Sequence, residues 1–174
     1  MTFSYGRRMT QSQETQSKET QSRDDRSPQA YSQRAVCRFT VGSWSESVFA
    51  DIDGEGTTMG ETYYPKRGLT RADVTYIYTG DIEGTGSVAY LISYMPAPAP
   101  VVGFERFEGS IGGHDGSCVL RHIGDQDAGS VTARLEVVPG LGTGGLTALR
   151  GEAELRISGH AENGYELVLD YDLD

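Results

Sequence analysis

The chain has 174 residues, which is enough for one domain with a real hydrophobic core, and it carries a formal net charge of −10. This charge argues against a nucleic-acid-binding protein, because phosphate backbones are bound by clustered lysine and arginine. No apolar run reaches the roughly 18 residues of a membrane span, and residues 1–9 are not followed by the apolar stretch of a secretory signal. We therefore expect a cytoplasmic protein with no membrane partner.

Residues 1–34 are expected to form a polar arm that is disordered in isolation. A five-residue repeat (TQSQE, TQSKE, TQSRD) occupies 10–24, and no apolar residue occurs between Thr10 and Gln29. Such a segment cannot bury enough surface to offset its ordering entropy. Its six basic and four acidic residues give it a charge opposite to that of the acidic remainder. We expect the arm to close over a binding site as a lid when ligand binds, with an inert tail as the alternative.

From residue 35 onward, apolar and polar residues alternate with a period of two. In 149–157 the odd-numbered residues are apolar or glycine and the even-numbered ones are charged, and 165–173 has a similar pattern. Alternation of this kind gives a strand one buried and one solvent-facing side, which is typical of antiparallel sheets. The residues expected inside include Val131, Leu155, Leu167 and Leu169.

Glycine-rich turns divide this part of the chain into about eight strands. Glycine supplies the positive φ that tight turns need. Short strands at regular spacing predict an all-β fold, a single antiparallel β-barrel domain at 35–174, whose interior can hold one small ligand. The expected strands lie at 35–44, 70–79, 85–95, 101–111, 117–123, 130–138, 147–158 and 164–173.

The sequence GGHDGS at 112–117 is expected to be the turn of a hairpin whose register can be argued. Pairing Ile111 with Cys118 places Phe107 opposite His122. A slip of one residue would bury charged side chains instead of apolar ones, at a greater cost. The face expected inside consists of Glu105, Phe107, Gly109, Ile111, Cys118, Leu120 and His122.

Glu105 and His122 are the candidate catalytic residues, and we expect them to share one cavity. An inward carboxylate in an apolar barrel is costly unless it is hydrogen-bonded, so Glu105 serves either a function or a structural network. An inward histidine is either a ligand contact or a hydrogen-bonded core residue. His114 and His160 are expected in exposed turns, so the three histidines form no metal triad, and we expect neither a metal nor a cofactor.

Many of the ten tyrosines fall on the inward strand faces. Tyrosine combines a broad apolar ring with a hydroxyl that needs a partner, so a barrel lined in this way suits a large, mostly apolar ligand with a few oxygens. The alternative is ordinary core packing. The candidate substrate-binding residues are Tyr76, Tyr78, Tyr90, Tyr94, Phe107, Leu120, Tyr165 and Tyr171.

Three other features have simple structural interpretations. GLGTGG at 140–145 matches the glycine pattern of a dinucleotide site, but the residues after it alternate like a strand, so we interpret it as a turn. DIDGEG at 51–56 lacks the spacing and the final glutamate of a calcium loop, which favours a solvated loop. Cys37 and Cys118 are expected to be buried free thiols.

Three segments resemble a family of small bacterial proteins of the DUF3224 type. They are GDIEGTGSVAYLISY (80–94), GFERFEGSIGGHDGSCVLRH (103–122) and VPGLGTGGLTALRGEAEL (138–155). The resemblance covers roughly 35–174 and implies an allene-oxide-cyclase-like barrel. The arm at 1–34 lies outside the usual family pattern.

A barrel of this kind with an added polar arm also resembles the spirotetramate-forming [4+2] cyclases (Diels–Alderases of the pyrroindomycin type) of actinobacterial polyketide antibiotic biosynthesis. This resemblance implies an enzyme that converts a linear polyene tetramate into a spirotetramate, with its N-terminal segment closing over the pocket. No short catalytic motif defines the group, so no binding residue is carried over from it.

The physical requirements of such a reaction fit the sequence. An intramolecular cycloaddition needs no cofactor; a barrel can hold diene and dienophile in a reactive geometry. Hydrogen bonds from protonated Glu105, His122 or an interior tyrosine to the tetramate carbonyls would lower the barrier. Two alternatives stay open, a non-catalytic barrel that binds a hydrophobic metabolite and an isomerase that uses Glu105 as general acid or base. The oligomeric state is also open, a homodimer being one alternative.

Overall fold

The computed structural model describes residues 30–127, 129–159 and 161–174, and within these ranges the chain forms strands, turns and loops. None of the described residues forms a helix that could cross a membrane. The strands are β1 (Gln33–Asp51), β2 (Gly56–Met59), β3 (Thr62–Pro65), β4 (Gly68–Gly80), β5 (Ile82–Tyr94), β6 (Ala99–Ile111), β7 (His114–Asp127), β8 (Ser130–Val137), β9 (Thr143–Gly144), β10 (Arg150–Ser158) and β11 (Tyr165–Asp172).

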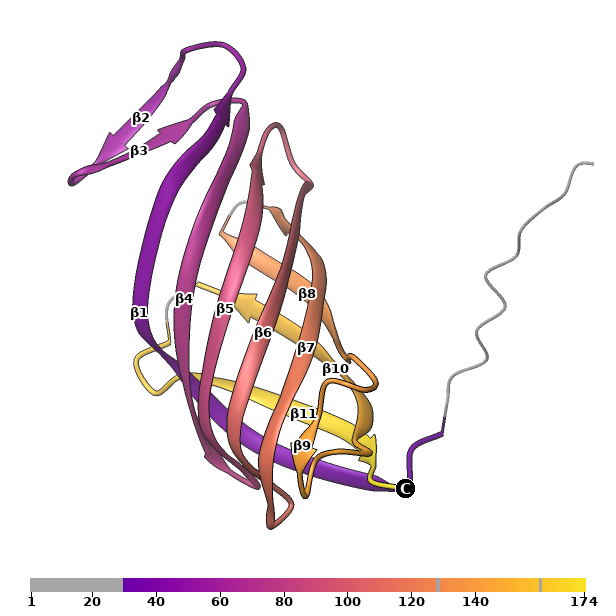
Figure 1. Ribbon diagram of the computed structural model, residues 1–174. Helices are drawn as coiled ribbons and strands as arrows, with labels where there is room; N and C mark the ends of the chain where they lie inside the picture. Colours follow the sequence, from indigo (N-terminus) through magenta and orange to yellow (C-terminus); the bar gives the residue numbers. More distant parts are fainter. Residues whose placement is uncertain (1–29, 128, 160) are drawn as a thin grey trace, which may run out of the picture.

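Eight of these strands close into an antiparallel barrel (Figure 1). Their order around the barrel is β6-β5-β4-β1-β11-β10-β8-β7, and pairing of β6 with β7 completes the circle. The prediction of a single all-β barrel of about eight strands is therefore confirmed. Strand β9 adds to the edge of β7, and β2 and β3 form a separate hairpin; none of these three strands was predicted.

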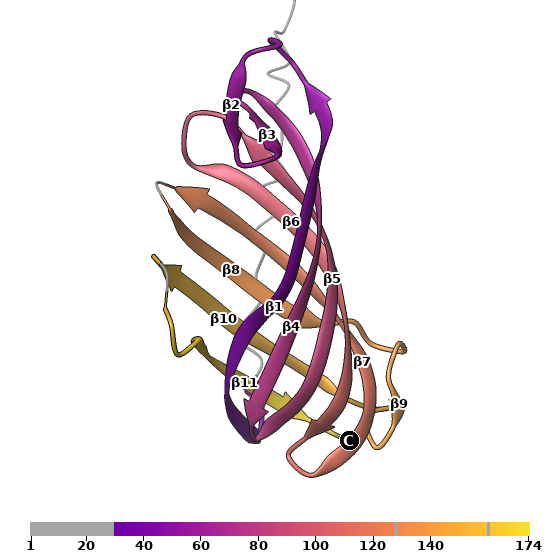
Figure 2. The same ribbon diagram turned by 90° about the vertical axis from the view of Figure 1, so that its left-hand side faces the viewer.

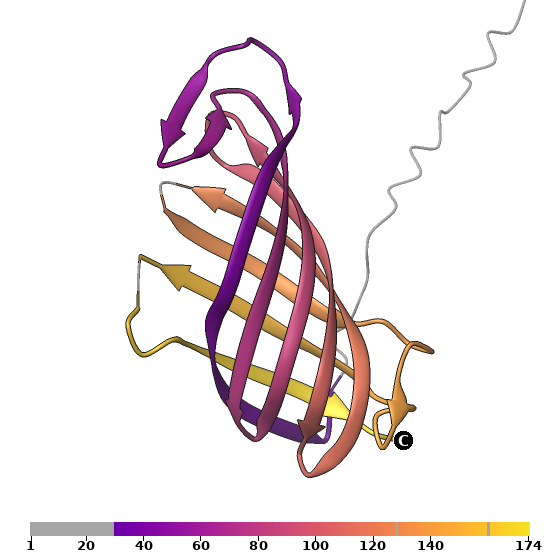
Figure 3. The same cartoon turned by 60° about the vertical axis from the view of Figure 1, so that its left-hand side comes forward.

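One wall of the barrel is longer than the other. Strand β1 has 19 residues and β4 to β7 have 13 or 14, whereas β8, β10 and β11 have 8 or 9. The short strands consequently stop well below the β2–β3 hairpin (Figure 2 and Figure 3). The barrel thus has an open end, which we call the mouth, formed by the long wall and the β2–β3 hairpin.

Strand β1 shows how the mouth arises. It pairs with β11 only from Gln33 to Phe39, but with β4 as far as Asp51. Beyond Phe39 its inward side chains therefore have no opposing strand on the β11 side. Val41, Trp44 and Val48 pair with the inward residues of β4, yet they remain 39–49% exposed.

The opposite end of the barrel is closed. Leu146 and Leu149, from the segment between β8 and β10, are buried there against the core. The interior above them is filled by side chains such as Phe107, Leu135 and Leu167, which leave an apolar cavity of only about 10 Å³. Leu155, Leu167 and Leu169 lie in this core as predicted, while Val131, nearer the mouth, is half-buried. The predicted buried free thiols, Cys37 and Cys118, are confirmed, and burial raises the pKa of each to about 12.

The predicted register of the β6–β7 hairpin is wrong by four residues. Ile111 pairs with His114 instead of Cys118, and Phe107 pairs with Cys118 instead of His122. The turn consists of Gly112 and Gly113 alone, both at positive φ (57° and 83°), which suits a two-residue hairpin turn. A shift of four is even, so the predicted inward face is unchanged. His114 opens β7 instead of lying in the turn, and it is exposed.

Two predictions concern residues outside the described ranges. The arm at 1–29, as lid or tail, and the exposure of His160 both stay predictions. Gln33 and Arg34, at the end of the expected arm, belong to β1, where Gln33 pairs with Tyr171. These two residues therefore lie at the closed end of the barrel, away from the mouth.

Candidate functional site

A continuous chain of hydrogen bonds crosses the middle of the barrel. The Tyr76 and Tyr90 hydroxyls are 3.2 Å apart, and the Tyr90 hydroxyl lies 2.8 Å from Nδ1 of His122. Nε2 of His122 is 2.8 Å from Oε2 of Glu105, whose Oε1 accepts a hydrogen bond of 2.8 Å from Tyr78. All five side chains are buried. We call this group the polar chain; it joins both predicted catalytic residues to three of the predicted tyrosines.

Strands β4 to β7 position the polar chain through their shared inward faces. Tyr76 and Tyr78 come from β4, Tyr90 from β5, Glu105 from β6 and His122 from β7. Two glycines make room for it. A Cβ on Gly86 would lie 1.7 Å from Oε1 of Glu105, and a Cβ on Gly103 would lie 2.5 Å from the Tyr90 ring.

Two proton arrangements satisfy this geometry. If Nε2 of His122 donates to an ionised Glu105, Nδ1 accepts from Tyr90, and Tyr90 in turn accepts from Tyr76. If Glu105 is protonated and donates to Nε2, Nδ1 donates to Tyr90 and Tyr90 donates to Tyr76. In the second arrangement the Tyr76 proton is left over, so Tyr76 becomes a donor for a ligand oxygen. The polar chain can therefore transmit a change of protonation from Glu105 to Tyr76.

Burial keeps the tyrosines of the polar chain protonated. Loss of solvent raises the pKa of Tyr76 to about 12 and raises the pKa of Tyr78 and of Tyr90 well above its ordinary value. The nearby Glu105 carboxylate raises the pKa of Tyr78 further. At neutral pH all three hydroxyls therefore keep their protons.

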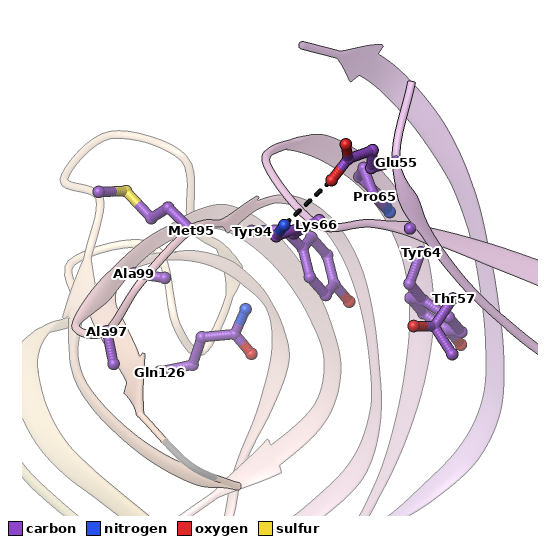
Figure 4. Close-up of a pocket in the computed structure, with 11 residues that line it drawn as sticks. Glu55, Thr57, Tyr64, Pro65, Lys66, Tyr94, Met95, Ala97, Ala99 and Gln126 are labelled. Carbon is purple, nitrogen blue, oxygen red and sulfur yellow. Dashed lines mark hydrogen bonds and ion pairs between the residues drawn. The ribbon is translucent and has the colours of Figure 1, made fainter. Parts of the chain in front are cut away.

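A pocket of about 510 Å³ lies at the mouth (Figure 4). Tyr64 of β3 and Tyr94 of β5 form one side, with their ring centroids 5.8 Å apart. The amide of Gln126 points into the pocket and donates a hydrogen bond of 2.8 Å to the Ser93 carbonyl. The volume of the pocket falls within the roughly 300–1,000 Å³ that is usual for small-molecule sites. The remaining lining residues are Glu55, Gly56, Thr57, Pro65, Lys66, Met95, Ala97 and Ala99.

A second carboxylate stands beside this pocket. Oε1 of Glu46 accepts hydrogen bonds from Thr70 (2.5 Å) and from the Tyr94 hydroxyl (2.8 Å), and Oε2 accepts one from Trp44 Nε1 (2.9 Å). Burial, followed by the bond to Glu46, raises the pKa of Tyr94. Glu46 thus holds Trp44 and Tyr94, two aromatic residues of the mouth, in place.

The pocket and the polar chain lie on the same inward strand faces. Tyr94 is four residues from Tyr90 along β5, and Gln126 is four residues from His122 along β7. At roughly 3.3 Å per residue, the pocket lies about 13 Å above the polar chain. Ile92, which is buried, stands between them on β5.

The other predicted binding residues are dispersed. Tyr94 lines the mouth pocket, and Tyr165 is half-buried, with its hydroxyl donating to the Gly159 carbonyl. Phe107 and Leu120 belong to the packed core below the polar chain, and Tyr171 is buried at the closed end, where a Cβ on Gly112 would meet its hydroxyl. The structure therefore brings together Tyr76, Tyr78 and Tyr90, but not the whole predicted set.

Sequence reasoning missed Glu46, Tyr64 and Gln126. It ended the first strand at Trp44, two residues before Glu46. Register shifts between Val41 and Ser43, and between Val48 and Ala50, change which residues face inward. The spacing of two between Trp44, Glu46 and Val48 is the signal that would have extended the strand.

Comparisons with known proteins agree on the fold. A family model described as a protein of unknown function (DUF3224) matches residues 35–169. The crystal structure of a protein of unknown function from the DUF3224 family of Shewanella oneidensis MR-1 is similar, with a TM-score of 0.57 and 21% identity, covering 82% of this chain and 97% of that chain. At this identity the likeness shows a shared fold. No curated protein matches.

Proposed function

This chain belongs to the DUF3224 family, whose function is unknown, and we propose that it is a cofactor-independent cyclase that closes an elongated, mostly apolar polyene by an intramolecular [4+2] cycloaddition. The substrate class, a linear polyene tetramate that becomes a spirotetramate in polyketide biosynthesis, is taken from the resemblance of the sequence. The observation that carries the proposal is an aromatic-lined pocket that opens the barrel above a buried Tyr–His–Glu hydrogen-bonded chain.

The mouth supplies the surface for binding. Trp44, Val41 and Val48 form an inward wall that is half exposed, and Tyr64 and Tyr94 form an aromatic side of the pocket. A flexible polyene bound there loses the freedom that keeps diene and dienophile apart in solution. Restricting this freedom is the main contribution that a protein makes to a unimolecular cyclisation.

The polar chain supplies polarisation. A hydrogen bond to a carbonyl conjugated with the dienophile withdraws electron density and favours the cycloaddition transition state. Tyr76 is the end of the polar chain that lies beside the mouth wall, because it pairs with Val41. In the arrangement in which Glu105 is protonated, Tyr76 has a proton to donate. Substrate reaches it by displacing side chains such as Ile92 between the pocket and the polar chain.

The test is incubation of the protein with a linear polyene tetramate. Formation of an isomer of equal mass, faster than in buffer, is the expected result. Tyr90→Phe removes the hydroxyl that links Tyr76 to His122, and we expect it to lower kcat about tenfold or more. Thr79→Val is the control, since it removes a hydroxyl from the exposed outer face of β4 and should leave the rate unchanged. Equal rates for both variants would contradict a role for the polar chain.

A non-catalytic barrel that binds a hydrophobic metabolite is the second candidate, and one observation favours it. Among the described residues, no buried side-chain nitrogen or oxygen lacks a hydrogen-bond partner, so the polar chain is satisfied without ligand. Trp44 is the only tryptophan of the chain, and its fluorescence therefore reports on binding at the mouth. A saturable change of Trp44 fluorescence with the tetramate recovered unchanged would support this second function and contradict the cyclase.

A further inference from the structure

An island of apolar side chains lies on the outer surface of the barrel. Leu91, Val102, Phe104 and Ile123 face outward from β5, β6 and β7, and they are 39–57% exposed. These three strands lie side by side in Figure 1, with no other described strand drawn over them. Contiguous exposed apolar residues on a folded protein mark sites of interaction.

The strand register shows that the island is continuous. Leu91 pairs with Val102 and Val102 pairs with Ile123, which gives one apolar row across the three strands. Ala89 pairs with Phe104, which gives a second row beside the first. Side chains that are directly paired lie within about 5 Å of one another on the same face. The island therefore forms one continuous surface over β5, β6 and β7.

The island contains both a projection and a hollow. Phe104 on β6 is the most exposed of its apolar residues. Beside it the small side chains of Ser87 and Ala89 on β5 and of Thr75 on β4 line a depression of about 560 Å³ that Phe104 borders. One face thus carries a large aromatic residue and an adjacent recess.

The ends of the second row carry opposite charges. Asp73 of β4 pairs with Ala89, and Arg121 of β7 pairs with Phe104. Asp73 is 3.1 Å from Arg71 and is well exposed, while Arg121 contacts Glu136 and is also partly exposed. From β4 to β7 the second row therefore consists of an acidic, a small, an aromatic and a basic residue.

We propose that this island is the contact surface between two copies of the chain. A two-fold axis parallel to the strands and between β5 and β6 places the β4 side of one copy opposite the β7 side of the other. Phe104 then lies over the recess at Ala89 of the partner subunit. On either side, Asp73 faces Arg121 of the partner subunit. The apolar centre and charged rim match the composition of protein interfaces.

A second copy is favoured over an unrelated partner because this face contains its own complement. The projection and the recess lie on neighbouring strands at equal distances from the axis, and so do the acid and the base one strand further out. A single two-fold rotation therefore brings Phe104 onto the recess and Asp73 onto Arg121 of the partner subunit. Binding of an unrelated partner would not require these features to lie at equal distances from one axis.

Analytical ultracentrifugation of the full chain over a concentration series tests the proposal. We expect a reversible dimer, with Phe104→Asp raising the dissociation constant by at least about 30-fold. Asp73→Arg and Arg121→Glu should each raise it roughly tenfold, and the double variant should restore the original value, because it only exchanges the two signs.

Glu154→Arg combined with Arg156→Glu is the matched control, since this exposed ion pair lies on β10, across the barrel from the island. It should leave the dissociation constant unchanged, and circular dichroism shows that each variant is folded. A wild-type chain that stays monomeric at every concentration would overturn the proposal. So would a dimer that is insensitive to Phe104→Asp, or a double charge variant no tighter than the single ones.

Discussion

The two ends of this barrel are made from the same strands, but one end is closed and the other is open. At the closed end β1 pairs with β11, β9 adds to β7 below β8, Leu146 and Leu149 cover the interior, and the cavity is only about 10 Å³. At the mouth β1 continues past Phe39 without β11, and a pocket of about 510 Å³ remains. Because both ends have the same alternation, strand length is what separates a packed core from an open pocket in this barrel.

The polar chain lies at the border of the two regions. Tyr78 and Glu105 contact the packed core, where Tyr78 borders the small apolar cavity. Tyr76 and Tyr90 are the members nearest to the mouth, because Tyr76 pairs with the exposed Val41. Changes on the two sides of this border should therefore have different consequences for stability and for binding.

The largest effect on stability is expected at the closed end. Phe107→Ala removes a buried ring from the packed core and should lower the free energy of unfolding by about 3–5 kcal/mol. Phe49→Ala, at an exposed position near the mouth, is the matched control and should cost less than about 1 kcal/mol. Urea denaturation measures both. Similar losses for the two variants would mean that the ends of the barrel do not differ as described.

An intermediate effect on the free energy of unfolding is expected at the polar chain, on the border between the core and the mouth. Gly86→Ala places a methyl group where Oε1 of Glu105 lies, so the carboxylate must move and its bond to Tyr78 is lost. We expect a loss of roughly 2–3 kcal/mol, from overpacking and from the broken buried hydrogen bond.

A double-mutant cycle of Gly86→Ala with Tyr78→Phe checks that cause. The second change removes the same hydrogen bond, so the two losses should be less than additive. Strict additivity would show that the methyl group acts through something other than the polar chain.

The smallest effect on stability is expected at the mouth. Trp44→Phe keeps an aromatic ring on the inward wall but removes the hydrogen bond to Glu46, and it should change the free energy of unfolding by less than about 1 kcal/mol. Binding of the polyene tetramate should weaken severalfold, because the smaller phenyl ring has no hydrogen bond to Glu46 that fixes its orientation. Isothermal titration calorimetry measures the affinity. A large loss of stability with unchanged affinity would assign Trp44 to the core instead of the mouth.

Much of the barrel follows from local pattern. The alternation of 149–157 and of 165–173 places Leu155, Leu167 and Leu169 in the core, because burial of one strand face dominates any other local preference. The same reasoning places Glu105 and His122 inside even though their hairpin register is wrong. A face depends only on whether a shift is odd or even, whereas the register depends on the length of the turn.

The site depends on contacts that the pattern does not contain. The polar chain joins residues from separate strands, Tyr76, Tyr90 and His122. The two tyrosine hydroxyls and the histidine ring nitrogen meet only because β4, β5 and β7 curve around one interior. Glu46 and Gln126 were missed for related reasons. Register shifts hide the inward position of Glu46, and only the folded mouth brings Gln126 near Tyr94 and the β2–β3 hairpin.

The amino-acid sequence by itself determined the all-β class, the number of barrel strands and the inward face of most barrel strands, since these follow from a period of two and from glycine turns. The tertiary structure alone decided that the barrel is closed at one end and open at the other. That outcome depends on how far β1 runs beyond β11, and therefore on pairing between segments more than 120 residues apart. Alternation within a strand is a local property, but the place where a strand loses its neighbour is not.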